Sequence, residues 1–131
     1  MKKDIEFPEA KDVYVVATHE WNDEFLSKDW NTYIVNNRPT PIDMVLIVTK
    51  GYDEKRKTSL MRHAIGEVGA NSFAKIELMQ EEVLALNNEF FVTYYADNKI
   101  YEKRFLFEKN TISELKQQPI PVLNLDGIFA K

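Results

Sequence analysis

The chain has 131 residues, of which 44% are hydrophobic and 29% are charged, and its formal net charge is −4. These values are ordinary for one globular domain and are not those of a disordered, fibrous or membrane-embedded chain. The sequence contains no cysteine, which excludes disulfides, cysteine-ligated zinc and a thiol nucleophile.

The first residues do not have the pattern of a signal peptide. Lysines at positions 2–3 are followed at once by acidic residues, and no apolar core comes after them. The longest apolar runs, such as 44–48, are five residues long and too short to span a membrane. We therefore expect a soluble, cytoplasmic protein with a single domain over residues 1–131.

Short β-branched and aromatic runs, separated by turn residues, follow one another along the chain, which is the pattern of β-strands. In chain order they predict strands over 13–18, 30–37, 42–52, 60–68 and 73–79, a hairpin over 89–107 and a last strand in the tail after residue 119. The run 42–52 is the most hydrophobic and is expected to lie centrally in a sheet. Within 73–79, strict alternation would bury Ile76 and turn Glu77 away from the core.

The hairpin is the clearest element. A two-residue turn at Asp97-Asn98 tolerates positive φ at both positions. Such a turn fixes the pairing of the two strands, and the predicted cross-strand pairs are Phe90 with Phe105, Val92 with Lys103 and Tyr94 with Tyr101.

Two segments have local helical signals. The stretch "QEEVLALN" (80–87) could form two turns, with glutamates in the first turn favoured by the helix dipole. The stretch "TISELKQQ" begins with the capping-box spacing of Thr111 and Glu114 and stops at Pro119. The fold class predicted from all these elements is all-β: a single-domain antiparallel β-sandwich of immunoglobulin-like type, with seven to eight strands and one or two short helical turns. A closed barrel is the alternative.

Histidines and carboxylates are the first candidates for a catalytic or metal site. His19 and Glu20 stand close to Asp23 and Glu24, but neighbouring residues of a strand point to opposite faces. We interpret this stretch as a polar strand end followed by a solvated loop, and His63 as a hydrogen-bonded structural residue. No catalytic, cofactor-binding or metal-binding constellation is recognised, and we expect neither an enzyme nor a cofactor.

Aromatic side chains raise a carbohydrate-binding alternative. A stacking platform could be built from Trp21, Trp30, Tyr33 and Tyr52. The competing interpretation, which we favour, is that Trp30 is the core tryptophan that a sandwich commonly buries.

The stretch "TKGYDEKRKTSLMRH" (49–63) is the main candidate for binding a partner. It carries five cationic and two acidic side chains in an acidic chain. A nucleic-acid patch would need a broad basic surface, which the sequence does not supply, so nucleic acid is not the expected ligand. We interpret the stretch as a hairpin tip and predict partner contacts at its exposed residues: Tyr52, Lys55, Arg56 and Lys57.

Four segments resemble a small family of uncharacterised bacterial proteins of about this length: "DWNTYIVNN", "GYDEKRKTSLMRH", "KIE" and "NNEFFVTYYADNKIYEKRFLF". Some members of that family carry a name that relates them to a phenylalanyl-tRNA synthetase subunit. The resemblance covers nearly the whole chain and implies a free-standing domain, and the name implies an association with RNA or tRNA.

The function expected from the sequence is therefore non-catalytic protein interaction, with a partner protein or by self-association through a loop or a sheet edge. The alternatives are an RNA- or tRNA-associated accessory domain and a carbohydrate-binding or small hydrolase sandwich.

Overall fold

Nine strands and two short 3₁₀ helices make up the part of the chain that the computed structural model describes, residues 9–131. The positions considered for a signal peptide, within 1–8, lie outside the described residues. The elements are β1 (Val13–Asn22), β2 (Ser27–Asn36), β3 (Ile42–Tyr52), β4 (Met61–Val68), β5 (Ser72–Met79), η1 (Glu81–Ala85), β6 (Asn87–Ala96), β7 (Lys99–Phe107), η2 (Glu114–Lys116), β8 (Gln118–Ile120) and β9 (Leu125–Phe129).

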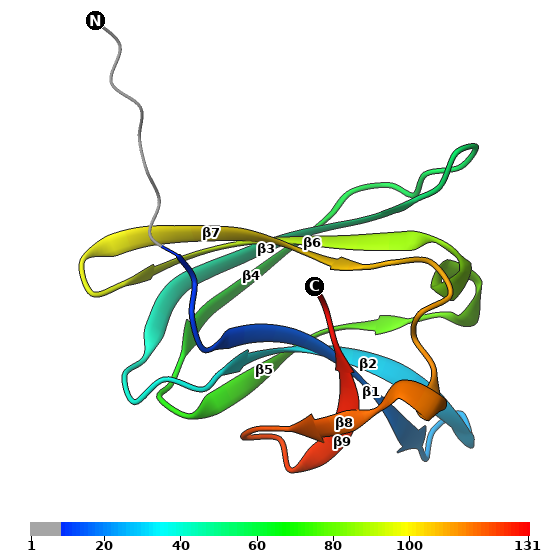
Figure 1. Ribbon diagram of the computed structural model, residues 1–131, viewed down its shortest axis with the longest axis horizontal. Helices are drawn as coiled ribbons and strands as arrows, with labels where there is room; N and C mark the ends of the chain where they lie inside the picture. The colour runs from blue at the N-terminus through cyan, green and yellow to red at the C-terminus, as the bar shows by residue number, and fades with distance from the viewer. Residues whose placement is uncertain (1–8) are drawn as a thin grey trace, which may run out of the picture.

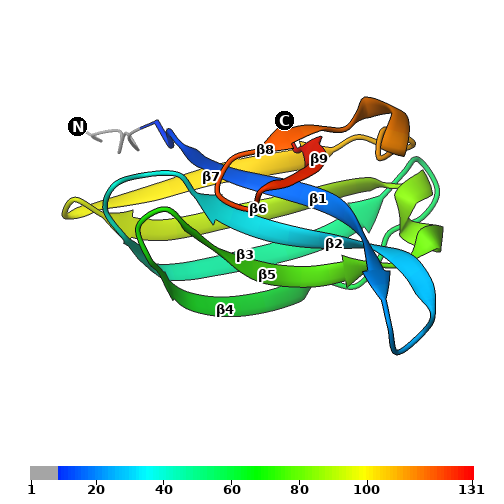
Figure 2. The same cartoon turned by 90° about the horizontal axis from the view of Figure 1, so that it is seen from below.

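The strands form two antiparallel sheets packed face to face, which confirms the predicted β-sandwich (Figure 1). The five-stranded sheet has the order β5-β2-β1-β9-β8 and the four-stranded sheet the order β4-β3-β6-β7. Strand β3 lies inside its sheet, as its hydrophobic sequence predicted. In Figure 2, β1, β2 and β5 cross in front of the four-stranded sheet. The immunoglobulin-like subtype stays a prediction.

The β6–β7 hairpin has the predicted turn and register. Asp97 and Asn98 both adopt positive φ, at 53° and 60°. The observed pairs are the three predicted ones, Phe90 with Phe105, Val92 with Lys103 and Tyr94 with Tyr101.

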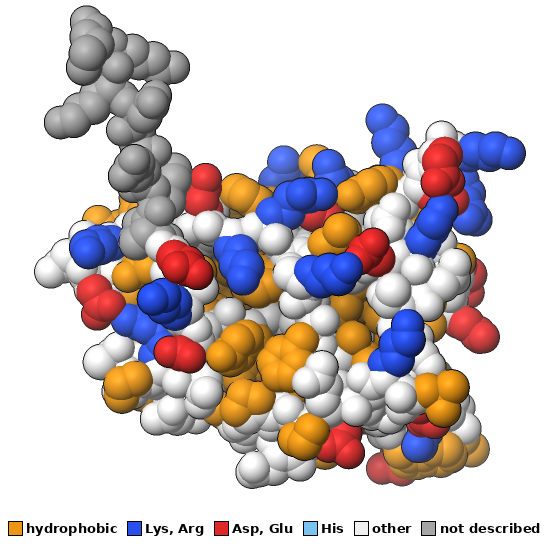
Figure 3. All heavy atoms as spheres, in the orientation of Figure 1, with side chains coloured by type: hydrophobic (Ala, Val, Ile, Leu, Met, Phe, Trp, Pro, Cys, Tyr) orange, Lys and Arg blue, Asp and Glu red, His pale blue; other side chains and the backbone are white. Residues whose placement is uncertain are grey.

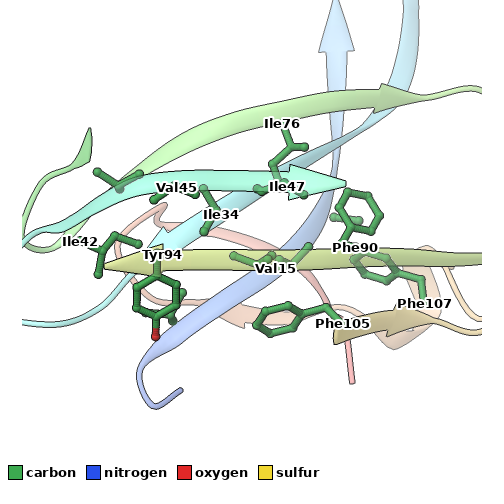
Figure 4. Packing of buried hydrophobic residues seen from close by; sticks show 14 of the residues in the cluster. Val15, Ile34, Ile42, Val45, Ile47, Ile76, Phe90, Tyr94, Phe105 and Phe107 are labelled. Atoms are coloured by element: carbon green, nitrogen blue, oxygen red, sulfur yellow. The ribbon is translucent and has the colours of Figure 1, made fainter. Parts of the chain in front are cut away.

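The main core lies between the two sheets and draws on both of them (Figure 4). Val15 and Ile34 from the five-stranded sheet meet Ile47, Phe90 and Phe105 from the four-stranded sheet. These five side chains are almost completely inaccessible to water, and burial of apolar surface of this kind is the main force that holds such layers together.

A second, smaller core covers the outer face of the five-stranded sheet. Val16, Tyr33 and Val35 pack there against Ile120 of β8. Beyond them, Oε2 of Glu20 accepts hydrogen bonds from Thr18, Asn31 and Tyr33, at 2.7, 2.9 and 2.7 Å. Strand β1 is therefore buried on both faces because the C-terminal segment returns over it.

The end of the chain links the two sheets. After β9 the backbone crosses to the four-stranded sheet, where Leu106 and Lys131 exchange hydrogen bonds of 2.9 and 3.2 Å. This contact occupies part of the free edge of β7. The edges of β4 and β5, on the other side of the sandwich, have no strand beside them among the described residues.

The sequence analysis was wrong in four local details. The predicted helix over 80–87 is only the 3₁₀ helix η1, and the capping box is absent because Ser113, not Thr111, caps the short η2. The tail forms two strands, β8 and β9, where one was expected. Glu77 does not point away from the core, for a reason given below.

Candidate functional site

Two hollows lie side by side at the end of the sandwich that carries η1, the right-hand end in Figure 1. Leu78 and Gln80, where β5 runs into η1, line both of them. We call the two together the end cleft. Hollow 1 is bounded by the β1–β2 hairpin and η1, and hollow 2 by the base of the β3–β4 hairpin and the start of β6.

Hollow 1 has a volume of about 580 Å³, which is within the range of ligand-binding pockets. Apolar side chains make up about half of its lining and include Trp30, Met79 and Leu84, with Phe25 at the rim, and polar and charged side chains make up the other half. Trp30 is only 7% exposed, which confirms that it belongs to the core and is not part of an exposed stacking platform.

The β1–β2 turn holds Phe25 out in solvent. Oδ1 of Asn22 accepts hydrogen bonds from the backbone N–H groups of Glu24 and Phe25, at 2.9 and 3.2 Å. On the other side of the turn, Asp29 accepts from Nδ2 of Asn22 at 3.0 Å. The turn is thus ordered by its own polar side chains, while Phe25 remains 65% exposed.

His19 and Glu114 join hollow 1 to the C-terminal segment. The imidazole ring of His19 stacks on Trp30 with centroids 4.5 Å apart, and its Nδ1 donates to Oε1 of Glu114 at 2.6 Å. Nζ of Lys28 lies 3.3 Å from the same oxygen. Hydrogen bonds from His19 and Lys28 hold the pKa of Glu114 below its ordinary value. His19 faces the inside of the sandwich and Glu20 the outside, as alternation predicted.

Hollow 2 is smaller, about 350 Å³, and has a carboxylate in its wall. Oε1 of Glu77 accepts from Oγ1 of Thr49 at 2.9 Å and from Nε2 of His63 at 2.7 Å. These partners belong to β3 and β4, so Glu77 bridges the open side of the sandwich between the two sheets. His63 is the hydrogen-bonded residue that the sequence analysis proposed.

A β-bulge explains why Glu77 points inward. The β2–β5 register shifts between Thr32 and Tyr33, whose partners are Glu77 and Lys75, so Ile76 is the extra residue. The hydroxyl of Thr32 bonds both the backbone N–H and the C=O of Glu77 and holds the bulge in place. Strict alternation therefore fails after Ile76, and the prediction that Glu77 faces away from the core was wrong.

Four exposed or half-exposed residues, Tyr52, Lys55, Arg56 and Lys57, lie at the tip of the β3–β4 hairpin, as the sequence analysis predicted. In Figure 3, basic side chains crowd the upper right corner, where Figure 1 places this tip. The guanidinium of Arg56 lies 2.8 Å from Oδ2 of Asp53, so its charge is partly neutralised within the tip.

Asp53 organises the hairpin tip. Its Oδ1 accepts from the backbone N–H groups of Lys55 and Arg56, and its Oδ2 from the Arg56 side chain. These bonds, first among them the one from Lys55, lower the pKa of Asp53 to about 2. The hairpin supplies Thr58 and Ser59 to hollow 2, whereas the predicted contact residues lie beyond it.

Exposed apolar side chains surround the end cleft, and the sequence analysis did not select them. Trp21 and Leu26 belong to the same β1–β2 hairpin as Phe25, Met61 lines hollow 2, and the exposed Leu60 precedes Met61 in the chain. Figure 3 shows apolar and acidic side chains together at the lower right, where Figure 1 places the β1–β2 turn. One sequence signal could have indicated these residues: "EFL" (24–26) places two apolar side chains in a turn whose other residues are polar. Turns are normally built from polar residues, glycine and proline.

No protein-family model and no curated protein matches the chain. Within residues 9–131, no helix is long and apolar enough to cross a membrane, and no group of three or more His, Asp or Glu side chains is placed to hold a metal ion.

Proposed function

We propose that this protein is a non-catalytic, cytoplasmic protein-interaction domain that binds a segment of a partner protein in the end cleft. The observation that carries the proposal is Phe25, an aromatic side chain held in solvent by a hydrogen-bonded turn at the rim of a hollow that has Trp30, Met79 and Leu84 in its lining. Aromatic side chains that are already ordered before binding lose little entropy when a partner covers them.

The exposed rim favours a macromolecular partner over a small molecule. A small ligand seated in hollow 1 would leave Trp21 and Leu26 in water, whereas a protein segment laid across the cleft would cover them. Met61, which is 54% exposed at hollow 2, would be covered by the same segment because Leu78 and Gln80 border both hollows. Large apolar side chains of this kind commonly provide most of the binding energy at interfaces.

The test is site-specific photocrosslinking in the cells that make the protein. A benzophenone amino acid replaces Phe25 in one variant, Met61 in a second, and Ile100 in a third. Ile100 is also exposed and apolar but lies at the opposite end, beside the β6–β7 turn, and is the matched control.

We expect one discrete protein adduct from positions 25 and 61 and none from position 100. An adduct with twice the mass of the chain would identify the partner as a second copy. No adduct at 25 and 61, or an equal yield at 100, contradicts the proposal. A fourth variant at Lys55 tests the hairpin tip, and an adduct found only there would move the contact to the residues predicted from the sequence.

A further inference from the structure

The cationic side chains of the end cleft already have carboxylate partners. Lys28 in hollow 1 pairs with Glu114 at 3.3 Å, and Nζ of Lys50 in hollow 2 lies 3.7 Å from Glu89. Neither Glu114 nor Glu89 lines the cleft, so each of these cations is neutralised from outside it.

The carboxylates of the cleft are not neutralised in the same way. Asp29 in hollow 1 accepts from the neutral side chains of Asn22 and Ser27, and among the described residues it has no cationic partner within 4 Å. Glu81 lines hollow 1 and is exposed, and no ion pair within residues 9–131 involves it. The cleft therefore presents uncompensated negative charge.

The rim adds more negative charge. Glu24 precedes Phe25 in the β1–β2 turn, and Glu82 follows Glu81 in η1; both are exposed and without an ion-pair partner in the described chain. Glu77 lies in the wall of hollow 2, where its second oxygen, Oε2, receives no described hydrogen bond. Acidic groups thus belong to the lining of the cleft and to the residues next to it in the chain, as the exposed apolar groups do.

We propose that the partner segment is extended, basic and apolar: an aliphatic or aromatic side chain enters hollow 1, and flanking lysine or arginine side chains face the carboxylates of the rim. This inference rests on the proposed function and adds the chemistry of the partner. Charge complementarity disfavours an acidic segment, which would bring carboxylates against Glu24, Glu81 and Glu82. The described cations of the cleft, Lys28 and Lys50, already pair with carboxylates.

Lysine and arginine suit this surface for a second reason. Their aliphatic stems pack on apolar groups such as Phe25 and Leu84 while their charged ends stay in water beside Glu81. The same segment can therefore cover the apolar rim and neutralise the acidic one. A hollow of about 580 Å³ has ample room for one large side chain from the segment.

The test measures binding of four fluorescein-labelled octapeptides to the full-length protein by fluorescence anisotropy. The peptides are GKKLWKKG, GEELWEEG, GSSLWSSG and GKKSSKKG, so charge and apolar content vary independently. We expect GKKLWKKG to bind about tenfold or more tightly than each of the other three, since several exposed charge pairs of up to about 1 kcal/mol act together with the apolar anchor. The preference over GSSLWSSG should shrink between about 20 mM and 500 mM NaCl.

A charge variant and its control test whether the preference for GKKLWKKG over GSSLWSSG comes from the carboxylates of the end cleft. The variant Glu24→Gln/Glu81→Gln/Glu82→Gln removes three exposed carboxylates of the rim without changing Phe25. We expect it to bind GKKLWKKG and GSSLWSSG within about twofold of each other, since the charge pairs that separate them are gone.

The matched control removes three carboxylates outside the end cleft, in Glu67→Gln/Glu102→Gln/Asp126→Asn, and changes the net charge by the same amount. We expect it to keep the full preference of the wild-type protein. An equal loss in the control would show that net charge alone attracts the basic peptide and would overturn the assignment to the cleft.

The outcomes separate this inference from the proposed function. Binding of GEELWEEG or GSSLWSSG as tightly as GKKLWKKG, with loss of binding in Phe25→Ser, overturns the basic partner and leaves the binding site intact. Binding of GKKSSKKG as tightly as GKKLWKKG overturns the apolar anchor. Failure of all four peptides overturns the inference, and the crosslinking at positions 25 and 61 still decides the proposed function by itself.

Discussion

Oε2 of Glu20 accepts hydrogen bonds from three polar side chains on the outer face of the five-stranded sheet. The hydroxyls of Thr18 and Tyr33 donate to it at 2.7 Å each, and Nδ2 of Asn31 donates at 2.9 Å. Thr18 is 1% exposed and Tyr33 is 9% exposed, so water has little access to either residue. The variant Glu20→Ala removes the acceptor and leaves all three donors in place.

The expected cost follows from these three bonds. A buried donor left without its acceptor costs about 1 kcal/mol or more, and a partly exposed donor costs less because water replaces the partner. Thr18 and Tyr33 are buried donors, and Asn31 is a partly exposed one. We therefore expect Glu20→Ala to lower the free energy of unfolding by about 2–3 kcal/mol.

Urea unfolding at neutral pH, followed by tryptophan fluorescence, measures this cost. The matched control is Glu67→Ala, an exposed carboxylate on β4 without a described hydrogen bond, which we expect to change the free energy of unfolding by less than about 0.5 kcal/mol. If Glu20→Ala costs no more than Glu67→Ala, the three hydrogen bonds do not stabilise the sheet as argued.

The same carboxylate makes stability depend on pH. Burial alone would raise the pKa of Glu20, but hydrogen bonds from Tyr33, Asn31 and Thr18 outweigh it, and the pKa falls below its ordinary value of 4.5. The ionised form therefore stabilises the fold above pH 4.5, and this contribution is lost as the pH falls through the lowered pKa of the folded state. We expect the difference in unfolding free energy between wild type and Glu20→Gln to be largest near neutral pH and to shrink in acid. A difference that does not change with pH would contradict the role of the charge.

Three further predictions concern packing and the hairpin tip. A Cβ at Gly127 would lie 2.5 Å from the carbonyl oxygen of Ala17, so Gly127→Ala should lower the free energy of urea unfolding by about 2 kcal/mol or more. Gly69→Ala, whose nearest neighbour would lie at 3.8 Å, should cost less than about 1 kcal/mol, and equal costs would refute the steric argument. Phe107→Ala, at a side chain 1% exposed, should cost about 3–5 kcal/mol in the same assay, and a cost below 1 kcal/mol would show that the core refills the space. The carboxyl of Asp53 should titrate by NMR near a pKa of about 2, and a value near 4 would show that its hydrogen bonds are not kept in solution.

The elements that the sequence predicts well are those whose geometry is set locally. The β6–β7 hairpin has the predicted register because a two-residue turn leaves no freedom in how its strands pair, and Asp97 and Asn98 both adopt the required positive φ. The predicted bounds of β3, 42–52, are also the observed ones.

Local signals failed where tertiary contacts compete with them. The segment 80–87 has glutamates suited to a helix start, but two turns of α-helix are too few to be stable by themselves. Nδ2 of Asn88 bonds the carbonyl oxygens of Val83 and Leu86, and these bonds hold the end of η1 against β6. The backbone at Leu86 is already extended, with ψ at 161°, so the helix ends there.

The acidic wall of hollow 2 could not be predicted from alternation. Glu77 turns inward because of a bulge at Ile76, and the bulge depends on a hydroxyl from Thr32, a residue 45 positions away in sequence. A single inserted residue reverses the faces of everything that follows it in a strand. Only the paired register shows such an insertion, so a site that depends on it is invisible to sequence patterns.

The sign of the charge at the proposed binding surface is the other feature that needs the structure. From the sequence, the cations of 49–63 stood out against an acidic chain, and contacts with a partner protein were predicted at the tip of that hairpin. Folding pairs Lys50 with Glu89 and Arg56 with Asp53, while Glu24 and Glu81 at the end cleft have no ion-pair partner among the described residues. Charges without partners contribute most to the attraction of a ligand from solution. The folded protein therefore presents unpaired acidic groups at the end cleft, beside a hairpin tip where Arg56 is paired and Lys55 and Lys57 have no ion-pair partner among the described residues.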